Sequence, residues 1–472
     1  MLFLPELSLL LSGLIFFFVS LTRPDSQTVK NLSIGLAAMV LFVTATCFSQ
    51  EGVLFFKSYR IDLFSQLFKL LIAAATLAVL VFSGQTPGIK EDVKAEYYLF
   101  LFIGVLGLMM LVSSVELLAI FIALELSSFT VYIMVPMRKT SGNTIFQMES
   151  GIKYLLFGVM STGFMLFGMS YLFGLTGSTY LDEIATSLSF LFNQPAALIG
   201  MIMVLFGFFY KLAIFPFHFW VPDVYEGAAN ETTAFIAAVP KIAATALLIR
   251  LVSLVSAEGQ TIANVLLVCS IASMFYGNLS ALVQKDIKRM LGFSGISHAG
   301  FILFGLLTFG TAGYATSLYY IMGYAAMNLA CFLVICSVAT DGDNLKIEDF
   351  TGLHKRSPFL AITLATALFA LAGIPPFVGF TGKFMLLVNA FRNGYTIPVI
   401  LAAINTGIAI YYYLSVVRIA YCTDPEKELS PISQPWPGRV AAIILLMVIV
   451  VMGIMPARFL DLATAAVSTL LS

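Results

Sequence analysis

Five charged residues lie within or beside long apolar segments of this chain, where a charge is costly. They are one glutamate and four lysines, namely Glu125, Lys153, Lys211, Lys241 and Lys383. A charged side chain at the centre of a membrane helix costs about 2.5–3.5 kcal/mol even on the more lenient insertion scales. Snorkelling or a structural ion pair would explain any one of them. Four lysines facing one deep glutamate are too many for pairing alone, so we expect some of the lysines to lack a fixed carboxylate.

Buried lysines without a fixed partner suit the relay of protons. Burial lowers the pKa of an amine and an approaching carboxylate raises it again, which is the property that a proton carrier needs. The spacing provides one local partner, Glu149, four residues before Lys153. Lys69 is set apart from this group, because it can snorkel to the interface or pair with Asp62.

Two proline breaks accompany two of these lysines. Lys211 lies five residues before Pro216, and Lys383 follows the pair Pro375 and Pro376. Proline removes a backbone donor and clashes with the preceding turn, so such a break persists at membrane depth only where protein or a water-filled cavity surrounds it. Broken helices mark ion pathways in transporters. A lysine and a break therefore occur together twice, and we expect both to line one proton path.

The chain offers no cofactor site of its own at the level of sequence. Its three histidines are too dispersed for a metal site, its five cysteines lack CxxC spacing, and neither GxGxxG nor GxxxxGK followed by Ser or Thr occurs. His298 lies in an apolar segment between two lysine-bearing regions and could transfer protons between them, and a hydrogen-bonded packing role fits its position equally well.

The elements that position these residues are membrane helices. The chain is 60% hydrophobic and only 11% charged, which excludes a soluble globular protein of this length. About fourteen apolar stretches are long enough to span a membrane, centred near residues 12, 40, 72, 105, 125, 162, 207, 242, 272, 301, 327, 374, 408 and 447. The first stretch contains Glu6 and no preceding Lys or Arg, so we expect a retained helix rather than a signal peptide. The predicted fold class is an all-α polytopic membrane protein.

The spacing of the charged groups indicates an internal repeat. Glu125 precedes Lys211 by 86 positions, and His298 precedes Lys383 by 85. We therefore predict two five-helix repeats, residues 97–255 and 260–422, in which the broken helices are the seventh and the twelfth. An odd number of helices makes the second repeat inverted relative to the first. Residues 1–96 would form three preceding helices and residues 423–472 the fourteenth.

Lysine and arginine fall mainly in the loops that follow odd-numbered helices. These residues are Arg23, Lys30, Lys90, Lys94, Arg138, Lys139, Lys285, Lys288, Arg289, Lys346, Lys355, Arg356 and Lys427. Because cytoplasmic loops are enriched in basic residues, both termini should face away from the cytoplasm. The loop after the seventh helix is an exception, since it carries Asp223, Glu226 and Glu231 without a basic residue.

Several long motifs resemble those of the antiporter-like membrane subunits of respiratory complex I, and most of all its N type. They are KLAIFPFHFWVPDVYEGA, ELSS at Glu125, GIKYLLFG, VPKIAA and GIPPFVGFTGKF. The resemblance implies that Glu125 and Lys211 form a modulating pair and that Lys241 is the central relay. It further implies that Lys383 is the terminal group and that Lys153 is an additional buried lysine.

The resemblance also implies partners. NADH, FMN, iron–sulfur clusters and quinone would be bound by other subunits. The direct neighbours of this chain would be the bilayer and membrane subunits of the A, H, J, K, L and M types. The peripheral redox arm would act on it only indirectly. It implies no nucleic acid, and a multi-pass location in a bacterial plasma (inner) membrane. The family commonly reads EGAPTPVTAF after the first break, whereas this chain reads EGAANETTAF at 226–235. A subunit of a multisubunit sodium/proton antiporter is the alternative, and a stand-alone solute carrier is a third.

Overall fold

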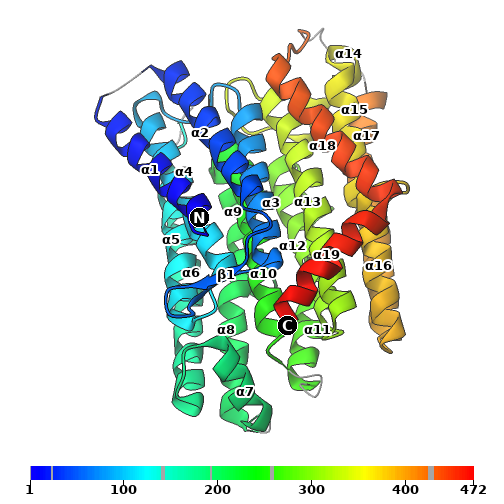
Figure 1. Ribbon diagram of the computed structural model, residues 1–472. Coiled ribbons are helices and arrows are strands. Elements are labelled where there is room, and N and C mark those ends of the chain that lie inside the picture. Colours follow the sequence, from blue (N-terminus) through cyan, green and yellow to red (C-terminus); the bar gives the residue numbers. More distant parts are fainter. Residues whose placement is uncertain are drawn as a thin grey trace.

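The computed structural model describes residues 2–22, 25–139, 144–191, 194–255, 260–423 and 430–471. They form an upright bundle of helices (Figure 1). Arg23 and Lys427, which contributed to the predicted orientation, lie outside the described residues.

Nearly all regular structure is helical. The longer helices are α1 (Leu4–Ser20), α2 (Ser26–Thr46), α3 (Leu63–Phe82), α4 (Lys94–Ser113), α5 (Leu117–Met134), α6 (Thr144–Thr176), α7 (Leu181–Leu191), α8 (Pro195–Leu212), α10 (Asn230–Val252), α11 (Gln260–Ala281), α12 (Ile287–Leu306), α13 (Thr311–Val338), α15 (Pro358–Ala372), α16 (Val378–Arg392), α17 (Thr396–Cys422), α18 (Trp436–Ile454) and α19 (Pro456–Leu471). The short ones are α9 (Trp220–Gly227), α14 (Leu353–Arg356), η1 (Glu91–Val93), η2 (Val135–Met137) and η3 (Ile347–Phe350). An antiparallel hairpin joins β1 (Gly52–Leu54) to β2 (Tyr59–Ile61).

The predicted all-α membrane class is confirmed. Among the described residues, twelve helices are long and apolar enough to cross a membrane, and α1 and α15 are shorter apolar helices. Thirteen of the fourteen predicted centres lie within one of these helices, and the one near residue 374 lies at the break between α15 and α16. The number that actually span, and the internal repeat, remain predictions. Helix α19, which packs against α3 and α13, was not predicted, because its apolar residues are confined to one face.

The basic loops gather at one end of the bundle, the upper end of Figure 1. Ile89 pairs with Arg138, and Asp286 with Lys346, through isolated β-bridges that join four different loops. The hairpin and α7 lie toward the opposite end (Figure 1). The bridges agree with the predicted grouping for these four loops, while the grouping as a whole and the side that faces the cytoplasm stay predictions. We call the upper end the basic-loop end.

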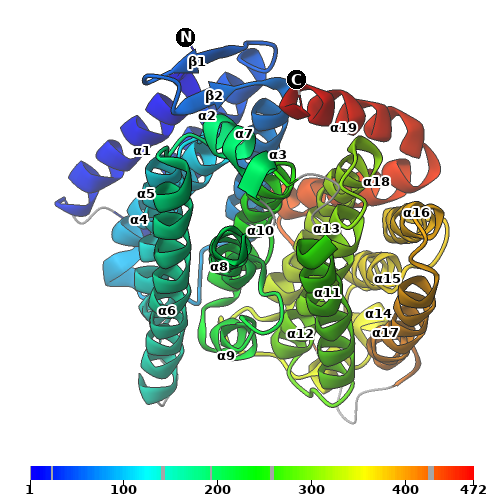
Figure 2. The ribbon, with the colours of Figure 1, turned by 90° about the horizontal axis from the view of Figure 1, so that it is seen from below.

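Helix α10 is the centre of the bundle. Every residue from Asn230 to Val252 is buried, because α3, α4, α8, α12 and α13 all pack around it. Figure 2 shows α10 enclosed between the first and the second half of the chain. The helix continues through Pro240, directly before Lys241.

Helix is interrupted at both predicted breaks. Helix α8 ends at Leu212 and is followed by Ala213 in the left-handed region, with φ of +64°. Helix α15 ends at Ala372 and is followed by Gly373, with φ of +87°. In both cases the next residue turns its N–H back to a carbonyl five residues earlier, which is a common way to end a helix. The two breaks therefore share one backbone geometry.

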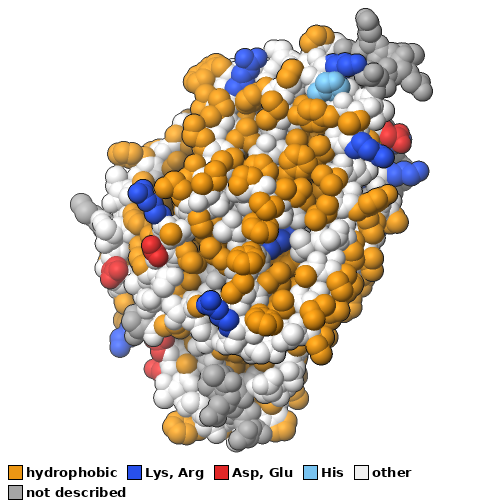
Figure 3. All heavy atoms as spheres, turned by 90° about the vertical axis from the view of Figure 1, so that its right-hand side faces the viewer, with side chains coloured by type: hydrophobic (Ala, Val, Ile, Leu, Met, Phe, Trp, Pro, Cys, Tyr) orange, Lys and Arg blue, Asp and Glu red, His pale blue; other side chains and the backbone are white. Residues whose placement is uncertain are grey.

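One side of the bundle is strongly apolar. The face that contains α16 and α17 is dominated by hydrophobic side chains (Figure 3). Phe384, Phe391, Ile397 and Tyr411 are among its exposed residues. Such a surface suits contact with lipid or with another membrane subunit.

Candidate functional site

At the first break, Lys211 and Glu125 bind neighbouring hydroxyl groups rather than each other. Lys211 lies in the last turn of α8 and is 2% exposed. Its Nζ donates to Ser128 Oγ at 2.9 Å. Glu125, one turn before Ser128 on α5, is half-buried and accepts a hydrogen bond from Thr162 Oγ1 at 2.6 Å. Lys211 still lies in the electrostatic field of Glu125. Their predicted role as a modulating pair stays a prediction.

Lys153 is not buried, so that expectation is wrong. Its side chain is 38% exposed and its Nζ forms ion pairs of 2.7 Å with both Glu149 and Asp223. The pairing with Glu149 at i, i+4 is confirmed. Asp223 was missed because α9 carries it back against α6 only after the break. Arg289 extends this cluster, since its guanidinium lies 3.0 Å from Asp223.

Lys241 is buried at the middle of the bundle, where aromatic rings surround it. It is 1% exposed, and its Nζ donates to Tyr324 OH at 3.1 Å. The Nζ lies 5.3 Å from the ring centroid of Tyr324 and 6.0 Å from that of Tyr225, so the π-faces stabilise its charge. A Cβ at Gly295 would lie 2.6 Å from this Nζ. The glycine thus provides the space that the lysine occupies.

His298 lies next to this group and bonds to two further tyrosines. Its Nδ1 is 2.6 Å from Tyr320 OH and its Nε2 is 3.2 Å from Tyr413 OH. Its ring centroid is 5.1 Å from that of Tyr324, the tyrosine that binds Lys241. A neutral imidazole has one donor and one acceptor nitrogen, so the two hydroxyls satisfy both. Tyr324 therefore contacts both groups, since its hydroxyl binds Lys241 and its ring packs against His298.

Lys383 binds backbone oxygens at the second break. It is 4% exposed, and its Nζ donates to the carbonyl oxygens of Leu371 at 2.9 Å and Ala372 at 3.3 Å. Its Nζ also lies 5.1 Å from the ring centroid of Phe301. The last carbonyls of a helix lack intrahelical partners and carry partial negative charge. The break exposes those oxygens, and Lys383 uses them in place of a carboxylate.

The tyrosines of this network were missed from the sequence. Tyr320 and Tyr324 are one turn apart on α13, and Tyr413 lies on α17. The signal was present in the apolar runs SLYYIMGY and IYYYL, because a hydroxyl deep in a membrane helix needs a partner. Asn328, also on α13, donates to Tyr324 OH at 2.7 Å.

A buried ion pair lies apart from this network, and its partners differ from those expected. Lys69 pairs with Glu6 at 2.7 Å rather than with Asp62, and both side chains of this pair are fully buried. Tyr59 OH donates to the same Glu6 carboxylate at 2.6 Å. Asp62 instead accepts the N–H of Ser65 at 2.7 Å and caps α3. The pair joins α1 to α3, which the sequence did not indicate.

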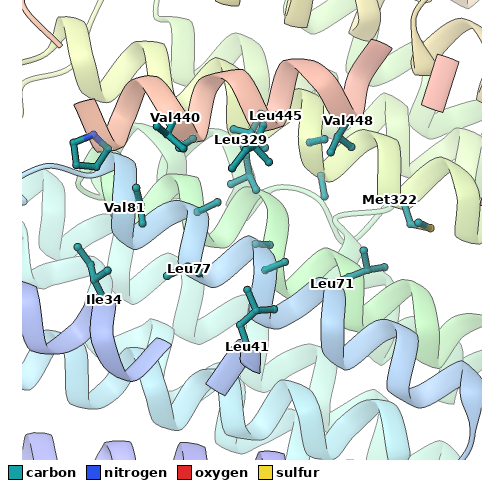
Figure 4. A pocket seen from close by; sticks show the side chains of 18 of the residues that line it. Ile34, Leu41, Leu71, Leu77, Val81, Met322, Leu329, Val440, Leu445 and Val448 are labelled. Atoms are coloured by element: carbon teal, nitrogen blue, oxygen red, sulfur yellow. The ribbon is translucent and has the colours of Figure 1, made fainter. Parts of the chain in front are cut away.

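An apolar groove of about 610 Å³ opens between α2, α3, α13 and α18 (Figure 4). Leu71, Leu77, Leu329 and Leu445 are among its lining residues, and no charged side chain lines it. Such a lining suits an acyl chain or an apolar helix rather than an ion or a polar solute.

Comparison with known proteins extends these observations. The family described as NADH:quinone oxidoreductase/Mrp antiporter, TM, matches residues 114–409. NADH-quinone oxidoreductase subunit N 2 of Opitutus terrae is 47% identical over 468 residues, which are 99% of this chain and 98% of that protein.

Solved structures share the fold over almost the whole chain. A chain of respiratory complex I from Thermus thermophilus with bound aureothin superposes with a TM-score of 0.83 at 26% identity, covering 98% of this chain and 99% of that one. A chain of the Mrp complex from a Dietzia species gives a TM-score of 0.85 at 19% identity, covering 99% and 96%, and shows the fold alone. The chain belongs to the NADH:quinone oxidoreductase/Mrp antiporter membrane-subunit family and, within it, to the N subunits of NADH-quinone oxidoreductase.

Proposed function

We propose that this chain translocates protons as a membrane subunit of NADH:quinone oxidoreductase and contains no redox centre of its own. The observation that carries the proposal is a series of buried side chains in contact, Lys241, Tyr324 and His298, which lies between the two breaks. These groups can hold and pass protons, and the surrounding helices exclude the lipid. The identity of 47% to an oxidoreductase subunit favours this function over the sodium/proton antiporter.

In the proposed mechanism, quinone reduction in partner subunits changes the electrostatic state at the first break. The interaction between Glu125 and Lys211 weakens, and Lys211 releases its proton toward Lys241. Helices α8 and α10 pack against each other, so the transfer stays inside the bundle. The proton then passes through His298 to Lys383 and leaves at the far side. NADH, FMN, iron–sulfur clusters and quinone remain on the partner subunits.

The proposed organisation follows the same division. Residues 97–255 and 260–422 would form the two inverted repeats, preceded by residues 1–96 and followed by residues 423–472. The subunit would lie in a bacterial plasma membrane with both termini outside the cytoplasm. Its direct neighbours would be the other membrane subunits of the oxidoreductase.

Two substitutions test the proposal in the complete oxidoreductase reconstituted into vesicles. Lys211→Met and Lys241→Met, made separately, should lower the number of protons pumped per electron while the complex still assembles. Lys285→Met is the matched control, because Lys285 is an exposed lysine in a loop at the basic-loop end. An unchanged proton-to-electron ratio in both assembled variants would refute the proposed function.

A further inference from the structure

The junction between α9 and α10 collects buried charge at the basic-loop end. The carbonyl oxygens that end α9 accept hydrogen bonds from two buried cations. Arg138 Nη1 donates to Glu226 O at 2.8 Å, and Lys288 Nζ donates to Ala228 O at 2.8 Å. Lys288 is fully buried and Arg138 is 7% exposed. The negative end of one helix thus holds two positive charges at the point where α10 begins.

Glu231 lies at this junction, in the first turn of α10. It is 2% exposed, and its Oε1 accepts the N–H of Gly88 at 3.1 Å. Its Oε2 is buried and has no hydrogen-bond partner within the part of the chain that the structure describes. Lys288 and Arg138 act on the carboxylate electrostatically. Buried polar atoms without any partner are rare in folded proteins, so this oxygen requires an explanation.

The backbone around Glu231 leaves room for the free oxygen. A Cβ at Gly88 would lie 2.8 Å from Glu231 Oε2 and 3.0 Å from the Cβ of Ala229. Glycine at this position therefore keeps the side of the carboxylate open.

Buried polar groups lie at both ends of the interval between Glu231 and Lys241, and among the described residues one of them, the Tyr225 hydroxyl, is unpaired. The two residues are ten positions apart on α10, a distance of about 15 Å along the helix axis. Thr232 Oγ1 donates to Tyr97 OH at 3.3 Å near the start of this interval. At its far end the buried hydroxyl of Tyr225 has no partner, although its ring centroid lies 6.0 Å from Lys241 Nζ. Buried groups of this kind are normally satisfied by ordered water, which conducts protons.

We propose that Glu231 is the proton-loading residue of this chain at the basic-loop end. Its carboxylate takes a proton from water at that end and becomes a carboxylic acid. The acid then passes the proton through the interval to the neutral amine of Lys241, which becomes an ammonium group while the carboxylate is restored. This inference rests on the proposed function, since Glu231 reloads the central lysine of that relay from the basic-loop end after Lys241 has passed its proton toward His298.

The groups that face Glu231 fit this role. Lys288 from α12 and Arg138 after η2 favour the carboxylate once the proton has left. Tyr97 and Tyr98 from α4 and Cys336 from α13 are its other titratable neighbours. A purely structural carboxylate would serve only to balance the two cations.

The test uses the complete oxidoreductase in vesicles and compares substitutions at the same junction. Glu231→Gln keeps an acceptor for the Gly88 N–H and cannot hold the transferred proton. It should lower the proton-to-electron ratio as far as Lys241→Met does. Glu226→Gln is the matched control, because the Glu226 carboxylate is partly exposed and binds Arg289 at 2.7 Å instead of facing the interval. It should retain the wild-type ratio.

The outcomes separate this inference from the proposed function. If Lys211→Met and Lys241→Met both pump normally, the proposed function itself fails, and if only Lys241→Met pumps normally, the loading role is overturned because its acceptor is not used. If Lys241→Met is defective and Glu231→Gln pumps normally, only the loading role is overturned. Should Glu231→Gln fail to assemble, Glu231→Asp restores a shorter carboxylate, and the pH dependence of its proton-to-electron ratio should shift from that of the wild type. An unshifted profile in the assembled aspartate variant would also overturn the loading role.

Discussion

The two helix breaks share a backbone geometry and differ in how they hold a lysine. At the first break Lys211 precedes the proline, binds Ser128 and lies in the field of Glu125. At the second break Lys383 follows the prolines and turns back onto the carbonyl of Leu371. The first lysine is therefore exposed to the charge of a nearby carboxylate, whereas the second is held by neutral backbone dipoles.

This difference indicates a division of labour. The electrostatic interaction between a carboxylate and a nearby lysine changes when either group gains or loses a proton. The first break can therefore respond to an electrostatic signal. Backbone carbonyls cannot be titrated, so Lys383 at the second break can only accept and release the protons that reach it. The groups that hydrogen-bond to His298 are likewise uncharged tyrosine hydroxyls, although Lys241 and Lys383 act on it electrostatically. The predictions that follow challenge this contrast.

The largest effect is expected from Gly379→Ala at the second break. An added Cβ would lie 1.7 Å from the carbonyl oxygen of Ala370, and a backbone oxygen cannot move aside easily. We expect a stability loss of about 3 kcal/mol or more and little assembled complex, measured by thermal unfolding and by the amount recovered from membranes. Gly407→Ala on α17 is the control, because nothing lies within 4 Å of its Cβ position. Equal recovery of both variants would contradict the prediction.

Ser128→Ala tests the first break. The lysine amine would lose the hydroxyl that it binds at 2.9 Å, and hydrogen bonds to charged groups contribute about 1.5–3 kcal/mol. We expect a loss of that order in thermal stability together with a lower proton-to-electron ratio. Ser127→Ala removes a hydroxyl that bonds only to Leu124 O of its own helix, at 2.7 Å, and should change neither quantity much. The contrast fails if the two serine variants behave alike.

Gly295→Ala probes the space beside the central lysine. The new Cβ would approach Lys241 Nζ to 2.6 Å and Tyr324 OH to 2.9 Å, so the flexible lysine must shift. We expect a stability cost of about 1–3 kcal/mol and a proton-to-electron ratio reduced toward that of Lys241→Met. Gly163→Ala on α6 meets no atom within 4 Å and serves as the control. A normal ratio at normal assembly would show that the position of Lys241 does not matter.

Tyr320→Phe examines the uncharged network of the second half. His298 would lose the partner that lies 2.6 Å from its Nδ1 and keep Tyr413. Because a buried neutral ring nitrogen is left without this partner, we expect a loss of about 1–3 kcal/mol, smaller than that of Ser128→Ala, which takes a partner from a charged amine. Thermal unfolding of the two variants side by side measures the difference. A larger loss for Tyr320→Phe would reverse the proposed contrast between the breaks.

Lys153→Gln should have the smallest effect. Its two ion pairs are partly exposed, and such pairs contribute about 0–1 kcal/mol and weaken as salt is added. We expect a small drop in unfolding temperature at low salt that disappears at high salt, with proton pumping close to normal. A salt-independent drop, or a clear loss of pumping, would mean that Lys153 belongs to the relay after all.

The parts of this site that could be predicted from the sequence are those that are unusual in a membrane helix, namely buried charges and prolines. Lys211, Lys241 and Lys383 are recognisable because each places a charge in an apolar run, and the breaks because proline cannot continue a helix. The bundle itself follows from apolar length. Tyr324 and Tyr413 are not unusual in this way, since a tyrosine is tolerated in a membrane helix until its hydroxyl needs a partner.

Other features depend on how distant segments meet. The link between Lys153 and Asp223 requires α9 to return against α6 after the break, and the link between Lys69 and Glu6 requires α1 to pack beside α3 and α4. No local pattern encodes these paths. Helix α19 was not predicted for another reason. Its apolar residues lie on one face, so its sequence contains no long apolar run, and a search for such runs does not find it.

The complete enclosure of α10 has a consequence for the membrane around the protein. Since every residue of this helix is buried, most of it is shielded from lipid, although Ile242 lines the apolar groove, and Lys241 is held at its depth mainly by neighbouring helices. Bilayers of different thickness act on a helix through the lipid that contacts it. The outer helices would tilt or adjust to a thinner or thicker bilayer while α10 keeps its place. The position of the central lysine would therefore depend little on the thickness of the surrounding membrane.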